Sequence, residues 1–320
     1  MAGPSANGMM MESRNHIKGF LYVLFSVCIW SGWVVVSRYG VKGALSVYDI
    51  TAIRFTTSGL LMLPIVLRKG FRIGPWGIWS GLLISILMGS CYTNVMFIGM
   101  RYAPVSHAST VNNGAFLTII TLIGMHGLRE HVSKTRLFGV FCTLAGIGIM
   151  LAAKSGSNAM TSEEWLGHLC FITAGAMWAV YVVLARAWHI DALHAAAVIC
   201  VLSMLTYMPF YLYFADSHIS MQHGGDVLLQ LVYQGVITGV LALVVFNKGI
   251  HLLGAARAGS VIPLIPALST LLAIPILHEY PSAMEWAGIA AVSFGVSLSS
   301  GALRWRHSRT LAQVAVRNID

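Results

Sequence analysis

Four aromatic side chains in the interior of apolar stretches could form a binding surface. Trp30, Trp33, Trp178 and Tyr181 lie well inside such stretches, whereas tryptophans of membrane proteins gather at headgroup level. Aromatic faces attract apolar or cationic molecules. We expect these four residues to line a central cavity and contact a substrate, with packing between helices as the alternative.

Amides in the same stretches add hydrogen-bonding capacity. Asn94 and Asn112 have apolar surroundings in the sequence, and a polar group in hydrocarbon is costly unless it is hydrogen-bonded. Such amides either join helices or face a cavity. Asn112 and Asn113 project about 100° apart on a helix, so one can pack while the other faces a substrate. We assign Asn94 and Asn112 to substrate binding.

Arg54 is the one arginine away from the end of an apolar stretch. An ionisable residue inside a membrane indicates a functional site, and the partner could be a substrate carboxylate or Asp49. We expect Arg54 to act near an outer gate. His107 is the other candidate for proton chemistry because histidine titrates near neutral pH. Its place at the start of a stretch favours a solvated histidine over a relay.

The sequence lacks the motifs that a metal site, a cofactor site or a catalytic site would need. The five cysteines contain no CxxC pair and the twelve histidines form no metal-ligand spacing, so we predict no metal site. No phosphate-binding loop, nucleophile motif or GxGxxG is present, so we predict no cofactor and no catalytic residue. A membrane enzyme would need clustered carboxylates or histidines that face one leaflet, and the eleven acidic residues are scattered. A sensor or scaffold would need a soluble effector region.

The composition predicts an all-α integral membrane protein. Hydrophobic residues make up 57% of the 320 residues and charged residues only 10%, against about 25% charged in soluble domains. Apolar runs of this length can cross about 30 Å of hydrocarbon, where helices satisfy their own backbone. We predict ten transmembrane helices: 17–38, 48–67, 76–100, 105–127, 137–153, 164–186, 192–214, 227–250, 258–278 and 283–303. Residues 1–16 are predicted to be a disordered tail, and 304–320 a basic tail.

The two halves of the chain repeat a pattern. Glu130 precedes Glu279 by 149 positions, and each is followed three residues later by serine. Glycines recur at the same offset as Gly139 with Gly288 and Gly146 with Gly295. We expect the glutamates to cap the helices that follow them and the glycines to allow close helix packing.

Five spans in each half give the halves opposite orientations in the membrane. Residues 17–153 and 164–303 would then be inverted repeats, an architecture of secondary transporters with the substrate near the midplane. Fifteen of the twenty lysines and arginines fall on the side that holds the N-terminus, and four on the other side. By the positive-inside rule both termini are cytoplasmic. The net charge of +9 is therefore a signal of topology and not of nucleic-acid binding.

The sequence resembles the EamA-like permeases of the drug/metabolite transporter superfamily. The tandem halves, the Leu-Arg-Glu and Leu-His-Glu hinges at Glu130 and Glu279, Trp30 with its counterpart Trp178, and Arg54-Phe55 carry the resemblance. Pro266 stands at the family's proline before Glu279, whereas Leu117 occupies the matching place in the first half. The resemblance implies outward transport of amino acids, related metabolites or drug-like cations in exchange for protons.

We therefore predict an inner-membrane secondary transporter that works by alternating access. Its partners would be a small metabolite, either amino-acid-like or aromatic and cationic, the lipid bilayer, and protons as the candidate coupling ion. A uniporter or importer of the same fold is the alternative, because direction and coupling leave no clear trace in the residues. The sequence gives no oligomeric state.

Overall fold

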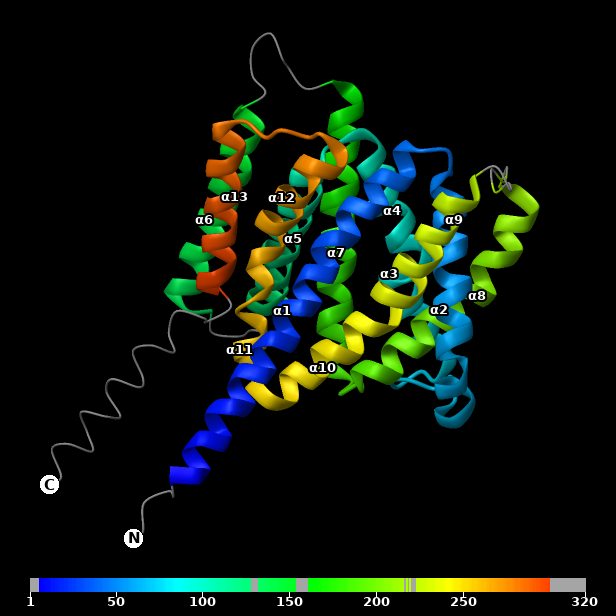
Figure 1. Cartoon of the computed structure of the whole chain (residues 1–320), viewed down its shortest axis with the longest axis horizontal. Helices are drawn as coiled ribbons and strands as arrows, with labels where there is room; N and C mark the ends of the chain where they lie inside the picture. The colour runs from blue at the N-terminus through cyan, green and yellow to red at the C-terminus, as the bar shows by residue number, and fades with distance from the viewer. Residues whose placement is uncertain are drawn as a thin grey trace, which may run out of the picture.

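The computed structural model describes residues 6–127, 132–153, 161–215, 217, 219 and 223–299, and its regular elements there are all helical (Figure 1). Glu130 lies outside the described residues. The α-helices are α1 (Ala6–Lys42), α2 (Val47–Lys69), α3 (Ile78–Met88), α4 (Ser90–Tyr102), α5 (Val105–Leu122), α6 (Lys134–Ala152), α7 (Ser162–Ala187), α8 (Ala192–Phe214), α9 (Gly224–Gln230), α10 (Ala242–Leu253), α11 (Ala255–Gly259), α12 (Ile265–Leu277) and α13 (Ala283–Ser299). The π-helical segments η1 (Ile123–Gly127) and η3 (Leu231–Leu241) and the 3-10 turn η4 (Ile262–Leu264) complete them.

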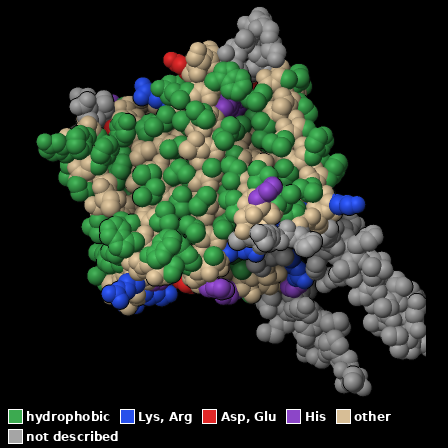
Figure 2. Space-filling model, turned by 180° about the vertical axis from the view of Figure 1, so that it is seen from behind, with side chains coloured by type: hydrophobic (Ala, Val, Ile, Leu, Met, Phe, Trp, Pro, Cys, Tyr) green, Lys and Arg blue, Asp and Glu red, His purple; other side chains and the backbone are tan. Residues whose placement is uncertain are grey.

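Nine helical segments of the described chain are long and apolar enough to cross a membrane, and α13 is a shorter apolar helix. Their outer surface suits lipid: Leu60, Phe141 and Leu212 are 57%, 66% and 75% exposed. Figure 2 shows one face covered by hydrophobic side chains, with lysines and arginines toward its edges. The prediction of an all-helical, multi-pass membrane protein is confirmed.

Several of the predicted spans are interrupted, and span 258–278 is divided among α11, η4 and α12. Span 76–100 breaks at Gly89 into α3 and α4, and the Ser90 N–H freed there donates to the Ser203 hydroxyl of α8 at 3.2 Å. Span 227–250 contains the π-helical segment η3 between α9 and α10. Hydropathy alone does not reveal such breaks, because the neighbouring helix supplies the missing hydrogen bond.

The helices lie in a row of packed pairs. Figure 1 shows α6 beside α13 at one edge and α2 beside α8 toward the other. Between these edges, α1 packs against α10 and α12, and α7 packs against α4 and α5. The first helix of each predicted half therefore contacts helices of the other half.

Glycines lie where α6 and α13 cross. A Cβ on Gly146 would come within 2.8 Å of the Gly288 carbonyl oxygen, and a Cβ on Gly288 within 2.6 Å of the Gly146 carbonyl oxygen. Gly139 and Gly295 approach each other in the same way. Residue numbers rise along α6 while they fall along α13, so the two helices run antiparallel.

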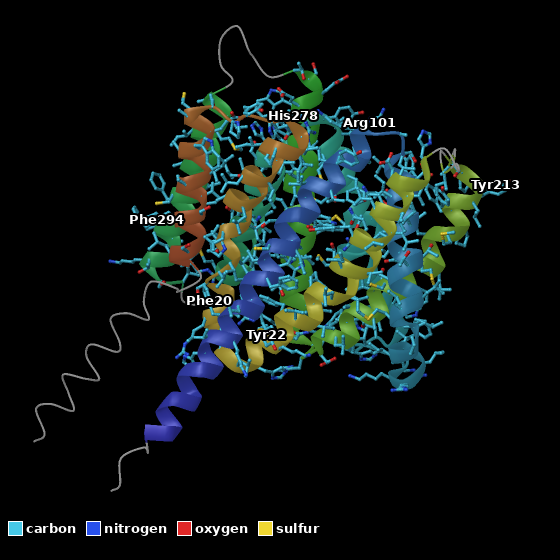
Figure 3. All side chains as sticks on the ribbon, viewed as in Figure 1. Phe20, Tyr22, Arg101, Tyr213, His278 and Phe294 are labelled. Carbon is cyan, nitrogen blue, oxygen red and sulfur yellow. The ribbon has the colours of Figure 1, made fainter. Side chains whose placement is uncertain are left out.

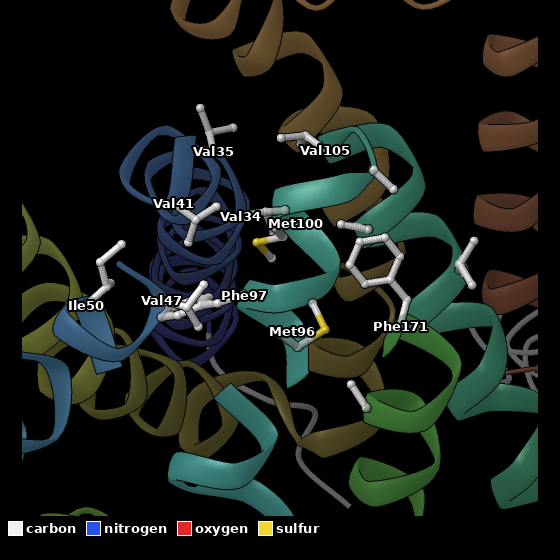
Figure 4. Close-up of a cluster of buried hydrophobic side chains, with 14 of the residues drawn as sticks. Val34, Val35, Val41, Val47, Ile50, Met96, Phe97, Met100, Val105 and Phe171 are labelled. Carbon is white, nitrogen blue, oxygen red and sulfur yellow. The ribbon is translucent and has the colours of Figure 1, made fainter. Parts of the chain in front are cut away.

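The core between α1, α4 and α7 is built from large apolar side chains. Phe97, Met100 and Phe171 are fully buried, and Figure 4 shows the α4 side chains between α1 and Phe171. Gly99 permits this packing, because a Cβ there would lie 2.6 Å from the Phe171 ring. This cluster fixes α4 against both opening helices.

An ion pair joins four helices at the end of the bundle that holds Arg101 and His278 (Figure 3). Arg38 of α1 pairs with Glu279, which follows α12, and also donates to the Ala103 carbonyl at 2.6 Å. The second oxygen of Glu279 accepts from the Val105 N–H at 2.9 Å. Glu279 therefore satisfies the N-terminus of α5.

The sequence led us to expect Glu279 at the N-terminus of the helix that follows it, α13. Ser282 and Glu285 occupy that place instead: the Ser282 N–H donates to Glu285 at 2.7 Å, and the Glu285 N–H donates to the Ser282 hydroxyl at 3.3 Å. This is a reciprocal capping box. The turn after α12 leaves Glu279 directed toward α1 and α5.

Close packing of α6 on α13 predicts that Gly146→Leu destabilises the protein by about 1–3 kcal/mol, the usual cost of overpacking. Gly148→Leu is the matched control, because Gly148 is exposed on the same helix and a Cβ there meets nothing within 4 Å. Thermal unfolding of the purified protein in detergent measures both. Equal unfolding midpoints for the two variants would contradict the packing.

The buried ion pair between Arg38 and Glu279 predicts a larger loss of stability than the glycine contact does. Glu279→Gln leaves Arg38, 5% exposed at its side chain, without its negative partner, and removal of one partner from a buried pair costs about 3 kcal/mol or more. We expect a clear fall in the unfolding midpoint in the same thermal assay.

Asp191→Asn provides the control for Glu279→Gln. Asp191 is 59% exposed, lies 3.4 Å from Lys69, and accepts from the His194 N–H at the start of α8. That hydrogen bond, with help from Lys69, lowers the pKa of the Asp191 carboxyl. Asparagine still caps a helix, and an exposed pair contributes less than about 1 kcal/mol. A Glu279→Gln loss no larger than this control would refute the buried-pair interpretation.

Candidate functional site

A polar cluster lies inside the bundle where α1, α2 and η3 meet. The Gln234 side-chain oxygen accepts from Trp33 Nε1 at 2.7 Å and from an Arg54 guanidinium nitrogen at 2.9 Å. The Gln234 side-chain nitrogen donates to the Ser37 hydroxyl at 2.9 Å. Gln234 is fully buried, so it holds Trp33 and Arg54 in fixed positions relative to each other.

Arg54 has no acidic partner among the described residues. Its guanidinium carbon lies 5.6 Å from the Trp33 ring centroid and 5.6 Å from that of Phe55. Asp49, considered above as a partner, accepts instead from the Tyr211 hydroxyl at 2.5 Å and takes part in the capping box of α2. A cation held by an amide and two aromatic rings can receive an anion.

The two tryptophans in equivalent positions have different neighbours. Trp30 contacts Phe246 of α10 with ring centroids 4.8 Å apart, whereas Trp178 stacks on Phe116 of α5 at 4.1 Å. Tyr181 packs against the cluster formed by α2, α3 and α8. All three side chains remain partly exposed, and their contact with a substrate stays a prediction.

Asn94 connects three helices. Its side-chain oxygen accepts from the Thr51 hydroxyl at 3.1 Å and from the Tyr207 hydroxyl at 3.3 Å, and its nitrogen donates to the Ser90 carbonyl at 3.0 Å. These bonds give Asn94 a structural role between α2, α4 and α8. Its hydrogen-bonding capacity is largely used within the protein.

Asn112 on α5 differs from Asn94. It is 5% exposed, and its side-chain oxygen has no hydrogen-bond partner within the described part of the chain. Tyr92 forms a side-chain hydrogen bond with Asn112 and interacts electrostatically with Arg54, which places Asn112 near the Arg54 cluster. A buried oxygen without a donor is costly, and a substrate donor would satisfy it.

Pro266 is the second residue of α12 and has a local structural effect. Its carbonyl accepts from the Thr270 hydroxyl at 2.7 Å and from the Ser269 hydroxyl at 3.1 Å. The Ser269 oxygen also lies 3.0 Å from the Ser109 oxygen of α5. These contacts connect α12 to the helix that carries Asn112.

His107 is not solvated, contrary to the expectation from its place in the sequence. It is fully buried between His168 of α7 and Glu285 of α13. Residues 61 and 178 positions away cannot be found by local spacing. Among the described residues, no group of three or more His, Cys, Asp or Glu side chains could hold a metal ion.

Sequence reasoning missed Gln234 and its neighbour Gln230, which are both fully buried. The Gln230 side-chain nitrogen donates to the Val36 carbonyl at 3.1 Å. Two glutamines four residues apart within an apolar stretch share one helix face, and this signal could have identified them. Their partners on α1 are distant in sequence and appear only in the fold.

Comparisons with known proteins agree with the membrane fold. An uncharacterized transporter of Archaeoglobus fulgidus is 23% identical over 295 residues, covering 91% of this chain and 98% of that protein. YedA of Escherichia coli strain K12, an uncharacterized inner membrane transporter, is 24% identical, with 88% and 89% covered. One protein crystal structure matches with a TM-score of 0.57 and 22% identity over 90% of this chain and 96% of that one, which shows the fold alone.

The EamA-like transporter family matches residues 17–152 and, a second time, residues 165–301. Together the two matches cover most of the 320 residues. They coincide with the many apolar helices of the structure and with the transporter names of the relatives. The chain is a multi-pass membrane protein that belongs to the EamA-like transporter family.

Proposed function

We propose that the protein is a secondary transporter of a small metabolite that carries a carboxylate, working by alternating access between two inverted five-helix repeats. Counting α13 as the tenth span makes the repeats 17–153 and 164–303. The antiparallel crossing of α6 and α13 supports this arrangement. With the offset of 149 between the halves, Gly139 corresponds to Gly288 and Gly295 to Gly146, so the Gly139–Gly295 and Gly146–Gly288 contacts are equivalent under the repeat. Such a repeat offers two equivalent conformations that open to opposite sides.

We further propose that the protein lies in the inner membrane with both termini in the cytoplasm. The distribution of lysine and arginine supports this orientation, and a relative is named an inner membrane transporter. The end that holds Arg101 and His278 then faces outward (Figure 3). The outward direction of transport rests on the family resemblance, with import or uniport as the alternative.

The isolated charge of Arg54 is the observation that supports a substrate with a carboxylate. A cation inside the membrane needs a counter-charge, and the described residues around Arg54 supply Gln234, two aromatic rings and Tyr92 but no carboxylate. A substrate carboxylate would complete the site with charge-assisted hydrogen bonds. A cationic substrate would be repelled there, so we favour an amino-acid-like substrate over a drug-like cation.

The other polar group near Arg54 fits a zwitterion. The unsatisfied oxygen of Asn112 can accept from an ammonium group, while Arg54 binds the carboxylate and Trp33 covers the apolar part. Trp30, Asn94, Trp178 and Tyr181 would line the surrounding cavity. Arg54 thereby becomes a substrate-binding residue, a role more specific than the outer gate expected from the sequence.

Loss of the Arg54 charge should lower the transport of carboxylates. A hydrogen bond to a charged group contributes about 1.5–3 kcal/mol, so Arg54→Gln should reduce kcat/KM for an amino acid by about 10- to 100-fold. Counterflow in proteoliposomes, with a panel of amino acids and cationic dyes, measures this change. Arg101→Gln, which alters an exposed arginine at the end of α4, is the control.

Two results would overturn the proposal. Wild-type protein that moves no compound of the panel would refute transport of these classes. Equal carboxylate transport by Arg54→Gln and Arg101→Gln would refute the assigned role of Arg54 while leaving transport itself intact.

A second variant gives Arg54 a negative partner within the protein. In Gln234→Glu, the new carboxylate would lie where the amide oxygen now accepts from Arg54 and Trp33. It should compete with a substrate carboxylate and lower that transport by about tenfold or more. The protein should stay folded, because the new pair satisfies both charges. Unchanged carboxylate affinity in Gln234→Glu would argue against binding at Arg54.

A further inference from the structure

A chain of three titratable side chains lies within the bundle, apart from the Arg54 cluster. His107 Nε2 is 2.9 Å from a Glu285 carboxylate oxygen, and His107 Nδ1 is 2.7 Å from His168 Nε2. The exposed fractions are 0% for His107, 2% for His168 and 8% for Glu285. His107 and Glu285 lie in the first turns of α5 and α13, and His168 lies in the second turn of α7, so the chain joins three helices.

The hydrogen bonds fix the possible proton positions. Glu285 accepts from the Ser282 N–H on its other oxygen, which favours the carboxylate. His107 then donates from Nε2 to Glu285. When both imidazoles are neutral, His107 Nδ1 must accept from the Nε2–H of His168. The site then carries a charge of −1 from Glu285.

One added proton reverses the bond between the histidines. The proton enters at His168 Nδ1, and the hydrogen on His168 Nε2 passes to His107 Nδ1. His107 becomes an imidazolium that donates to both neighbours, while His168 is neutral again in its other tautomer. The charge of the site changes from −1 to 0. A buried carboxylate gains from such compensation, because an unpaired charge is costly away from water.

Other charges lie on the elements around this chain. Glu279 near the start of α5 is already engaged by Arg38 and the Val105 N–H. Trp165 and Phe171 flank the His168 ring on α7. Further titratable groups toward the same ends of the packed elements include Glu163, Glu164 and Cys170 on α7, Arg101 and Tyr102 on α4, Lys42 on α1, and His278 and Tyr280 before α13; Cys142 lies farther along α6.

We propose that Glu285, His107 and His168 form the proton-binding site of this transporter and hold the coupling proton as one charge shared by the two imidazoles. The proposal rests on the proposed transport function. Its link to the substrate is mechanical: α5 carries both His107 and Asn112, and α7 carries both His168 and Trp178. A changed hydrogen bond between α5 and α7 therefore acts on the helices that would line the substrate cavity.

Proton binding can be measured without transport. The full-length protein, labelled with ¹⁵N-histidine in lipid nanodiscs, should show two imidazoles that change tautomer together when the pH is lowered across the range in which the protein stays folded. His107→Gln should remove this coupled pair of signals. His278→Asn is the control, because His278 is exposed with a positive φ that asparagine accepts. Imidazole signals of His107 and His168 that do not change over this range would overturn the proposal.

A third variant separates charge from folding. Glu285→Gln keeps the capping box with Ser282, since glutamine also serves in that motif, but it removes the negative charge beside His107. The coupled tautomer change should then be lost over the same pH range while the unfolding midpoint stays close to that of the wild type. A coupled change that persists in Glu285→Gln would contradict the role of the carboxylate.

Transport then tests whether the bound proton is the coupling proton. In proteoliposomes, a pH gradient should stimulate wild-type uptake, and His107→Gln should lose this stimulation while substrate exchange at equal pH persists. Full stimulation in His107→Gln would overturn the coupling role. Absence of any flux in the wild type would refute the proposed transport function, whereas the imidazole titration would still decide whether the site binds a proton.

Discussion

The absence of water in the hydrocarbon layer is the constraint on which the structure depends. Every polar group there must find its partner within the protein. Arg38 binds Glu279 and a backbone carbonyl, and the Ser90 N–H freed at the α3–α4 break donates to Ser203 of α8. Each of these contacts joins helices that are distant in sequence. Polar groups thus determine which apolar helices become neighbours.

The same constraint makes the exceptions informative. Arg54 has an amide and aromatic rings around it but no described carboxylate, and the side-chain oxygen of Asn112 has no described donor. Among the described residues, Arg54 lacks a counter-charge, the Asn112 oxygen lacks a donor, and Tyr92 interacts with both residues. These features are expected of a site that a ligand completes. Asn94, by contrast, resembled Asn112 in sequence and is satisfied by its neighbours.

The two proposed sites share helices without sharing residues. Asn112 and His107 lie on α5, and Trp178 and His168 lie on α7, while Arg54 lies on α2. Coupling between substrate and proton would then need no direct contact between them. A change in how α5 and α7 are held together near His107 and His168 would alter the walls of the proposed substrate site.

Sequence alone determined the all-helical membrane class and the EamA-like family, because hydropathy and the repeated hinge at Glu130 and Glu279 are local signals. It also singled out Trp33 as a candidate substrate contact and Arg54 as a candidate gate. Only the tertiary structure showed that Gln234 joins Trp33 to Arg54 and that Glu279 accepts from the N-terminus of α5 rather than that of α13. It also showed that His107 is buried between His168 and Glu285. Those pairings connect helices far apart along the chain, so packing decides them and no spacing within the sequence records them.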